Sequence, residues 1–169
     1  PTITATSFFV RMQRVANSGS GRVDAWITNF TNVTWTNFVE SSGTISVPAT
    51  ANNVIAVGSF CSKRSWTADD NLGYNDVACT AGLLGDISTF SSLGPTRDGR
   101  LKPDITAPGQ RVASAHSISN TGEPISNIQK DGKHRLINGT SMATPVIAGA
   151  ALLALETDPD MSVEEFRTL

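Results

Sequence analysis

Eight residues, 138–145 (NGTSMATP), constrain the fold of this chain more than any other stretch. They separate a short run of mixed polar and apolar residues from a long run without charge. Gly139 has no Cβ, so it can adopt a positive φ in a tight turn. Pro145 lacks an N–H, which is tolerated near the start of a helix but not in its middle. The pattern therefore predicts a strand over 133–137, a tight turn, and an apolar helix that begins near Ser141.

A serine at the start of a helix is placed for acyl-transfer chemistry. The Ser141 hydroxyl is a weak nucleophile and needs an adjacent base. It also needs donors aimed at the oxyanion that forms after attack. The first N–H groups of a helix have no partner within the helix and lie at the positive end of its dipole. Removing one such donor costs about 3 kcal/mol of transition-state stabilisation. The competing interpretation is a plain turn or helix cap, since serine is a preferred N-cap residue.

The heptad 139–145 and the Ala- and Gly-rich run after it resemble the serine signature of the subtilisin-like serine proteases, or subtilases. Residues 47–58 (VPATANNVIAVG) resemble the segment that forms a central strand after the substrate pocket in that family. Residues 90–109 resemble a turn-rich stretch that precedes a strand, here 111–115. The resemblance implies an α/β fold, as a partial subtilisin-like three-layer parallel sheet with a β-rich N-terminal segment. Ala143, two residues after the serine, counts against the G-x-S-x-G elbow of α/β-hydrolases.

The resemblance also implies the roles of the residues around the serine. Ser141 is the nucleophile, and its own N–H is one oxyanion donor. Thr140 steadies the oxyanion through its hydroxyl. Asn138 and Gly139 line the leaving-group side through their backbone, and Met142 packs behind the serine. The implied reaction is hydrolysis of a protein or peptide substrate through an acyl-enzyme, with no cofactor.

The base and the acid that this serine needs do not occur in the settings of the family. The two histidines, His116 and His134, are not followed by Gly-Thr. His134 lies seven residues before Ser141, too far along a strand that rises about 3.3 Å per residue. We interpret both as surface histidines, and Asp104 as a structural residue that holds backbone N–H groups of its turn. The resemblance then implies that the catalytic Asp, His and oxyanion Asn lie upstream in a longer polypeptide.

Residues 1–44 differ from the family pattern. They are rich in Thr, Phe and Val, with a turn at 17–21 and an alternating run over 22–27, which predicts β-strands. We interpret 1–44 as a β-rich segment that could end an inserted β domain, and 45–169 as the C-terminal part of a catalytic domain. Near the end, Ser162 and Glu165 have capping-box spacing and predict a further helix.

The chain alone is expected to have no measurable peptidase activity, because it lacks the base. An alternative is a catalytically silent protease remnant that acts as a binding module. A half-domain cut through a parallel sheet exposes a long edge, so we expect dimerisation or a partner chain. Family resemblance favours a secreted or cell-envelope location.

Composition adds few further constraints. The net charge is −2 and charged residues are 17%, below the usual quarter, so neither a nucleic acid nor an anionic membrane is indicated. The uncharged run 141–155 is shorter than the ~18 residues of a membrane span and contains Pro145 and Gly149, which favours a core helix. Cys61 and Cys79 form either one disulfide, worth about 3 kcal/mol, or two free thiols.

A segment rich in Asp and Asn follows the first cysteine. Its oxygen atoms suit calcium, but their spacing does not match an EF-hand loop, so a solvated loop is the preferred interpretation. The residues concerned are Asp69, Asp70, Asn71, Asn75 and Asp76.

Overall fold

The computed structural model describes residues 21, 23–26, 39–80 and 83–169. Backbone contacts divide the chain into two compact units, Pro1–Trp35 and Thr36–Leu169. Of the strand predicted over 22–27, residues 23–26 are described, and they form neither helix nor strand. The turn predicted at 17–21 and most of the β-rich segment lie outside the described residues. The division at residues 44 and 45 stays a prediction.

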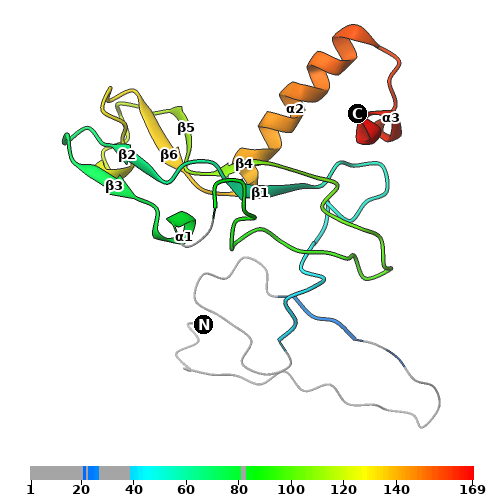
Figure 1. Cartoon of the computed structure of the whole chain (residues 1–169). Helices are drawn as coiled ribbons and strands as arrows, with labels where there is room; N and C mark the ends of the chain where they lie inside the picture. The colour runs from blue at the N-terminus through cyan, green and yellow to red at the C-terminus, as the bar shows by residue number, and fades with distance from the viewer. Residues whose placement is uncertain (1–20, 22, 27–38, 81–82) are drawn as a thin grey trace, which may run out of the picture. The chain divides into compact units, whose positions relative to one another are not determined.

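The second unit holds the regular elements of the described chain (Figure 1). In chain order they are β1 (Val57–Cys61), β2 (Ser65–Thr67), β3 (Gly73–Asn75), α1 (Val77–Thr80), β4 (Ile105–Gln110), β5 (Val112–Ala115), the 3₁₀ turn η1 (Ile125–Asn127), β6 (His134–Ile137), α2 (Thr140–Thr157) and α3 (Val163–Thr168).

These strands pair two by two. β1 and β4 run parallel, with Val57 opposite Ile105, while β2–β3 and β5–β6 are antiparallel. A parallel pair needs a long crossover connection, and here residues 62–104 supply it. Parallel strands with a helix packed against them confirm the α/β class predicted from the sequence.

Two predicted strand boundaries shift. The segment 47–58 is expected to contain a central strand, through its apolar run 54–57, but β1 begins only at Val57. The reason is that the backbone before it bonds elsewhere: the Val54 carbonyl accepts from Lys102 and Arg167. The turn-rich stretch 90–109 ends in a strand, because its last residues form β4 beside β1.

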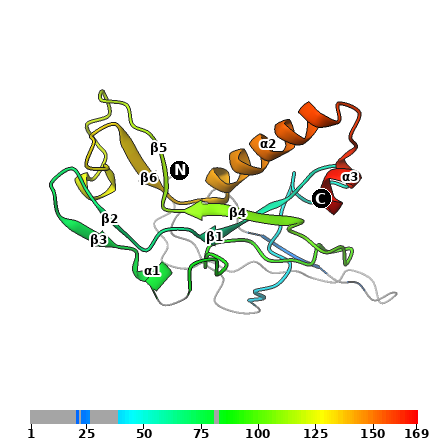
Figure 2. The same cartoon turned by 45° about the horizontal axis from the view of Figure 1, so that its top comes forward.

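The apolar core of the second unit is small and divided. One cluster joins Trp66, Ala68 and Leu136 under the β2–β3 hairpin. The other joins Ala107 of β4 to Ala143 and Ile147 of α2. Figures 1 and 2 both show the first turns of α2 beside β4. The helix is thus fixed to the parallel strands mainly by its N-terminal half.

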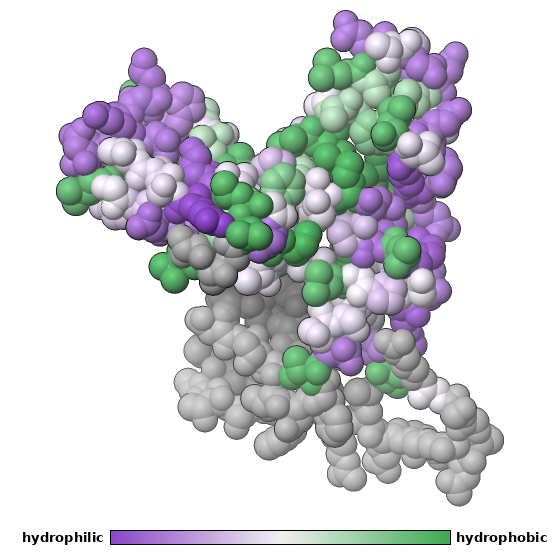
Figure 3. All heavy atoms as spheres, viewed as in Figure 1, coloured by the Kyte–Doolittle hydropathy of each residue, from purple (hydrophilic) through white to green (hydrophobic). Residues whose placement is uncertain are grey.

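Most of the apolar surface of α2 is exposed, which corrects the prediction of a buried core helix. Only Ala143 and Ile147 are buried, while Leu152 and Leu153 are 69% and 67% exposed. Figure 3 shows hydrophobic side chains gathered along this helix. A helix that is apolar all round needs cover on more than one side, and within the second unit β1 and β4 cover only part of it.

By length and composition alone, α2 also qualifies as a membrane span, with a mean hydropathy of 1.3 over 18 residues. Core helices of globular proteins pass the same test. Pro145 lies in its second turn, and Ala143 and Ile147 pack on the β1–β4 pair. These contacts are those of a helix that packs on a sheet.

Asp104 joins the two parallel strands at their N-terminal ends. Its carboxylate accepts the Ala56 N–H at 2.7 Å and Lys102 Nζ at 2.5 Å, and lies 3.3 Å from Arg167 Nε. The Lys102 side chain is only 3% exposed. Burial raises the pKa of the Asp104 carboxyl, but the bonds from Lys102 and Ala56 outweigh burial and hold that pKa below its ordinary value. The structural role predicted for Asp104 is confirmed, although the N–H that it holds belongs to the segment before β1.

Asp104→Asn keeps the shape of the side chain but removes its charge from beside buried Lys102. We expect the free energy of unfolding at pH 7 to fall by about 2 kcal/mol, measured by urea unfolding. Since the folded pKa is lowered, the contribution of the carboxylate is complete above the unfolded pKa of about 3.9 and is lost as pH falls through the folded value. The wild-type chain should therefore lose more stability than the variant on acidification below about pH 4.

Asp98→Asn is the matched control. Asp98 pairs with Arg100 Nε at 2.9 Å, but its side chain is 62% exposed. Exposed pairs contribute little, so this variant should unfold like the wild type. Equal losses for the two variants would show that burial of the Asp104 pair carries no special weight.

Candidate active site

Ser141 lies where a tight turn becomes helix α2. β6 ends at Ile137, Asn138 and Gly139 form the turn, and α2 begins at Thr140. Gly139 has φ 153° and ψ 152°, and its carbonyl accepts the Met142 N–H at 2.9 Å. The predicted strand, turn and helix are confirmed, with the helix starting one residue before the serine. Ser141 is exposed, and within the described part of the chain its hydroxyl makes no hydrogen bond.

Two hydrogen bonds tie this turn to the end of β4. The Gly139 N–H donates to the Gly109 carbonyl at 2.8 Å. The Arg111 N–H donates to Asn138 Oδ1, also at 2.8 Å. Both partners of the turn belong to the junction between β4 and β5, so the position of Ser141 depends on that junction.

Glycine is favoured at both positions, for different reasons. A Cβ on Gly109 would lie 2.8 Å from the carbonyl oxygen of Gly139, closer than real Cβ contacts. A Cβ on Gly139 would lie 3.4 Å from the Met142 sulfur, at a positive φ that L side chains rarely adopt. Two backbones therefore approach here at a distance that no side chain permits.

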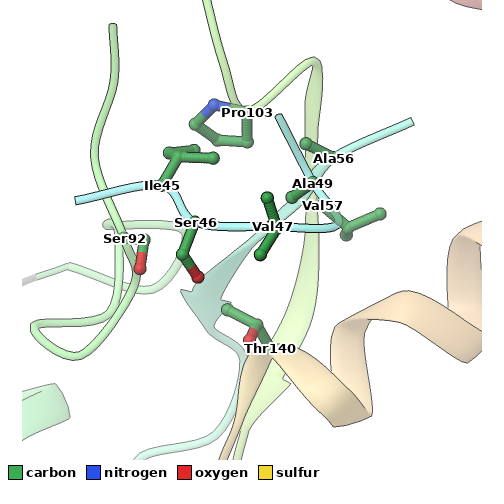
Figure 4. Close-up of a pocket in the computed structure, with 9 residues that line it drawn as sticks. All are labelled: Ile45, Ser46, Val47, Ala49, Ala56, Val57, Ser92, Pro103 and Thr140. Atoms are coloured by element: carbon green, nitrogen blue, oxygen red, sulfur yellow. The ribbon is translucent and has the colours of Figure 1, made fainter. Parts of the chain in front are cut away.

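A recess of about 160 Å³ opens beside Thr140 (Figure 4). Its walls come from the loop before β1, from β1 itself and from the turn-rich stretch before β4. In Figure 4, Thr140 faces Ser46 and Val47 across this recess. The walls carry no charged side chain among the described residues. Lining residues are Ile45, Ser46, Val47, Ala49, Ala56, Val57, Ser92, Pro103 and Thr140.

Sequence reasoning missed most of this recess. The resemblance placed a substrate pocket ahead of the strand at Val57, but it did not single out Ser46 or Ser92. Those two residues lie 46 positions apart in the chain, and hydrogen bonds between Thr44 and Leu93 join their segments directly. No local pattern in the sequence predicts that these two segments lie together.

The two histidines lie at the far end of the β5–β6 ribbon. Ala115 pairs with His134, and the His116 N–H donates to the Lys133 carbonyl, whereas the turn before α2 follows Ile137 at the other end. Three strand residues span about 10 Å, before the turn is counted. His134 Nδ1 lies 2.6 Å from Asp131 Oδ2 and is exposed, as predicted. His116 differs from the prediction of a surface residue, because it is half-buried with a buried Nδ1.

The segment rich in Asp and Asn, for which calcium was weighed against a solvated loop, has protein partners. Asp70 accepts the Leu72 N–H at 2.9 Å and the Tyr74 hydroxyl at 2.7 Å. These bonds hold the pKa of the Asp70 carboxyl below its ordinary value, with Tyr74 the main cause. Among the described residues, no group of three or more His, Cys, Asp or Glu side chains converges. Asp76 is buried and binds an arginine, so it departs from the predicted solvated loop.

Cys61 and Cys79 form a disulfide, which decides between the two predicted alternatives. Their Cα atoms lie 5.8 Å apart, and the bridge closes β1 onto α1 across 18 residues. On the chain-entropy model this crosslink stabilises the fold by about 3 kcal/mol.

Gly109→Ala tests the close approach of β4 to the turn. The new methyl would clash with the buried Ser59 side chain and with the Gly139 carbonyl, so we expect the free energy of unfolding to fall by about 1–3 kcal/mol. Gly149→Ala in α2 is the matched control, since a Cβ there meets nothing within 4 Å. That change should stabilise by about 0.5–1 kcal/mol, because alanine favours helix. Urea unfolding of both variants checks the contrast, and similar effects would disprove the steric argument.

Comparison with known proteins places the chain in a family. The model of the subtilase family matches residues 18–169. The serine protease AprX of Bacillus subtilis is 33% identical over 129 residues, which are 76% of this chain and 26% of that protein. The subtilisin-like protease SBT3.9 of Arabidopsis thaliana is 44% identical over 78 residues, 45% of this chain and 9% of that protein. The structure of the CspB protease of Clostridium perfringens is 26% identical, with a TM-score of 0.48, and the match covers 75% of this chain and 22% of that one.

The chain thus spans about a quarter of the length of AprX and less of the plant relative. The family match, in contrast, extends over nearly all of the present sequence, including the turn, the serine and the helix described above. This chain belongs to the subtilase family.

Proposed function

We propose that this chain is part of a serine endopeptidase that hydrolyses peptide bonds through an acyl-enzyme, with Ser141 as the nucleophile. One observation carries the proposal: an exposed serine hydroxyl stands at the start of α2, in a turn held by two hydrogen bonds to β4. An exposed hydroxyl can reach a substrate carbonyl. A fixed backbone provides donors that need not reorganise as charge develops.

In the proposed reaction, Ser141 Oγ attacks the carbonyl carbon of the scissile peptide bond while a base takes its proton. The negative charge moves to the former carbonyl oxygen, beside the Ser141 N–H and the Thr140 hydroxyl. The leaving amine receives the proton and departs on the side lined by the backbone of Asn138 and Gly139. Water then hydrolyses the ester and regenerates the serine.

The base, its acid and the oxyanion asparagine are proposed to come from upstream in a longer polypeptide. Three observations support this. Both histidines lie at the far end of the β5–β6 ribbon. The relatives are much longer than this chain. The apolar side of α2 is exposed around Leu152 and Leu153, where further polypeptide can pack.

The recess beside Thr140 is proposed to receive one side chain of the substrate. Its walls carry no charged side chain among the described residues, and Ser46, Ser92 and Thr140 contribute hydroxyls beside the apolar side chains. It adjoins the residue that precedes the nucleophile, so a side chain held there would keep its own carbonyl near Ser141. Binding of this kind converts attack into an effectively intramolecular step.

A secreted or cell-envelope location is proposed for the longer protein. The Cys61–Cys79 disulfide supports it, because such bridges persist in oxidising compartments and are rare in the cytosol. The alternative function, a silent remnant that binds other proteins, has no specific contact in the described residues to favour it.

Labelling by a fluorophosphonate tests the nucleophile. The full-length protein should be labelled at Ser141, as located by mass spectrometry, and Ser141→Ala should abolish labelling and lower kcat/KM by about 10⁴-fold or more. Ser114→Ala, at an exposed position of β5, is the control and should leave both unchanged. Labelling at another serine, or none in the full-length protein, would refute the assignment.

The isolated chain of 169 residues should not be labelled, because triad members act as a unit and the base is elsewhere. Labelling of Ser141 in this chain alone would show that it carries its own base.

The exposed side of α2 predicts self-association of the isolated chain. Sedimentation should give a mass above the 17.8 kDa of one copy. Leu153→Glu should shift the chain toward one copy, because a charge on this face opposes its burial. Leu101→Glu is the control, since Leu101 is 88% exposed but lies outside α2. A wild-type chain that sediments as a single copy would contradict the prediction.

A further inference from the structure

Arg111, between β4 and β5, has an unusual backbone. Its φ is 58°, in the left-handed region. For a residue with a Cβ this conformation is strained, because the Cβ comes too close to the following carbonyl oxygen. It persists only where the surrounding structure enforces it, and such positions cluster at functional sites. The backbone of Arg111 therefore points to contacts strong enough to hold it.

Those contacts come from its side chain. Arg111 Nε lies 2.7 Å from Asp76 Oδ2, and the guanidinium carbon lies 4.7 Å from the centre of the Trp66 ring. Arg111 also donates to Asn127 Oδ1 at 3.3 Å. An ion pair, a cation–π contact and a hydrogen bond thus fix the guanidinium from different directions.

Asp76 is itself held firmly. Its side chain is 5% exposed and accepts hydrogen bonds from Gln110 Nε2 and from the N–H groups of Ala78 and Cys79. Burial raises the pKa of this carboxyl, but the bonds from Gln110 and Arg111 outweigh burial and hold the pKa below its ordinary value. Asp76 is therefore an anionic anchor at neutral pH. It sits at the start of α1, which the Cys61–Cys79 disulfide ties to β1.

The backbone of Arg111 leads from this anchor to the serine. Its N–H donates to Asn138 Oδ1 at 2.8 Å, and Ser141 is three residues after Asn138. Two residues before Arg111, the Gly109 carbonyl accepts the Gly139 N–H. The φ of Arg111 sets the orientation of its N–H relative to its side chain, so the contacts of the guanidinium with Asp76 and of the N–H with Asn138 together match one value of φ.

We propose that Asp76 and Arg111 are positioning residues for the nucleophile: the ion pair between them holds Arg111 in its left-handed conformation, and its N–H thereby fixes Asn138 and the turn before Ser141. The proposal rests on the proposed function of Ser141. Neither residue touches the reacting atoms. Their effect passes through Asn138.

The chemical consequence is specific. If Arg111 relaxes to a negative φ, its N–H turns away from Asn138 and the turn loses one of its two ties to β4. The Ser141 hydroxyl and N–H then shift relative to the substrate carbonyl. Misplacement by about 1 Å lowers rates about 100-fold. The recess beside Thr140 has walls from other segments, so substrate binding is affected less than the chemical step.

The experiment uses the full-length protein and a peptide substrate. Asp76→Asn should lower kcat about 10- to 100-fold and leave KM within about 2-fold. Arg111→Gly should retain more activity than Arg111→Ala, because glycine adopts a positive φ without cost. Asp98→Asn, which breaks another arginine–aspartate pair, should leave kcat unchanged. Loss of activity in Asp98→Asn, or equal losses for the Gly and Ala variants, would overturn the proposal.

A double-mutant cycle tests the route through Asn138. Asn138→Ala alone should lower kcat, and adding Asp76→Asn should lower it little further, since residues on one route are not additive. Fully additive losses would show that Asp76 acts elsewhere.

Amide hydrogen exchange of the segment 137–142 gives a readout that needs no catalysis. Asp76→Asn should speed exchange of the Gly139 N–H at least several-fold, while Asp98→Asn should not. Unchanged exchange in Asp76→Asn overturns the positioning proposal even in an active enzyme. A wild-type protein without activity would instead refute the proposed function, and exchange would still decide whether Asp76 fixes the turn.

Discussion

The structure depends on the contact between the end of β4 and the turn before α2. Two backbones meet there, Gly109 against Gly139, at a distance that excludes a Cβ on Gly109. The contact does three things at once. It seats the first turn of α2 on the parallel strands, it fixes the carbonyl and N–H directions of the turn, and it places Ser141 at an exposed helix start. The same contact therefore contributes both to the stability of the sheet and to the geometry of the candidate site.

Much of this arrangement could be predicted from sequence, because it is local. Gly139 and Pro145 bracket a turn and a helix start, and the confirmed capping box of Ser162 and Glu165 begins α3. Asp104 was recognised as structural because its setting did not fit a catalytic acid. The tertiary contacts could not be predicted from local patterns. The positive φ at Arg111 and the contact of its side chain with a carboxylate 35 residues away have no counterpart in any local sequence pattern.

Helix α2 also shows that a sequence pattern does not reveal tertiary contacts. The uncharged run 141–155 predicts a core helix. That prediction assumes that other segments of this chain pack on all sides of the helix. In the described residues β1, β4 and Phe166 of α3 pack against the cluster around Ala143 and Ile147, whereas Leu152 and Leu153 stay exposed. A hydrophobic segment predicts that its surface will be covered, but it does not indicate which other segment covers it. The longer polypeptide proposed above would supply that cover.

The small residues around the turn before Ser141 explain why the Asp76–Arg111 ion pair, and not apolar packing, would hold it. Packing locks a position by filling space, but the residues at this contact are Gly109, Gly139 and Ala143, which are small because the backbones must approach closely. Small residues leave nothing to interlock. The turn must then be held by a side chain from a neighbouring segment, and a long side chain that ends in a planar guanidinium group can reach it. Arg111 spans from the turn to Asp76 and Trp66, where a disulfide makes the anchor rigid.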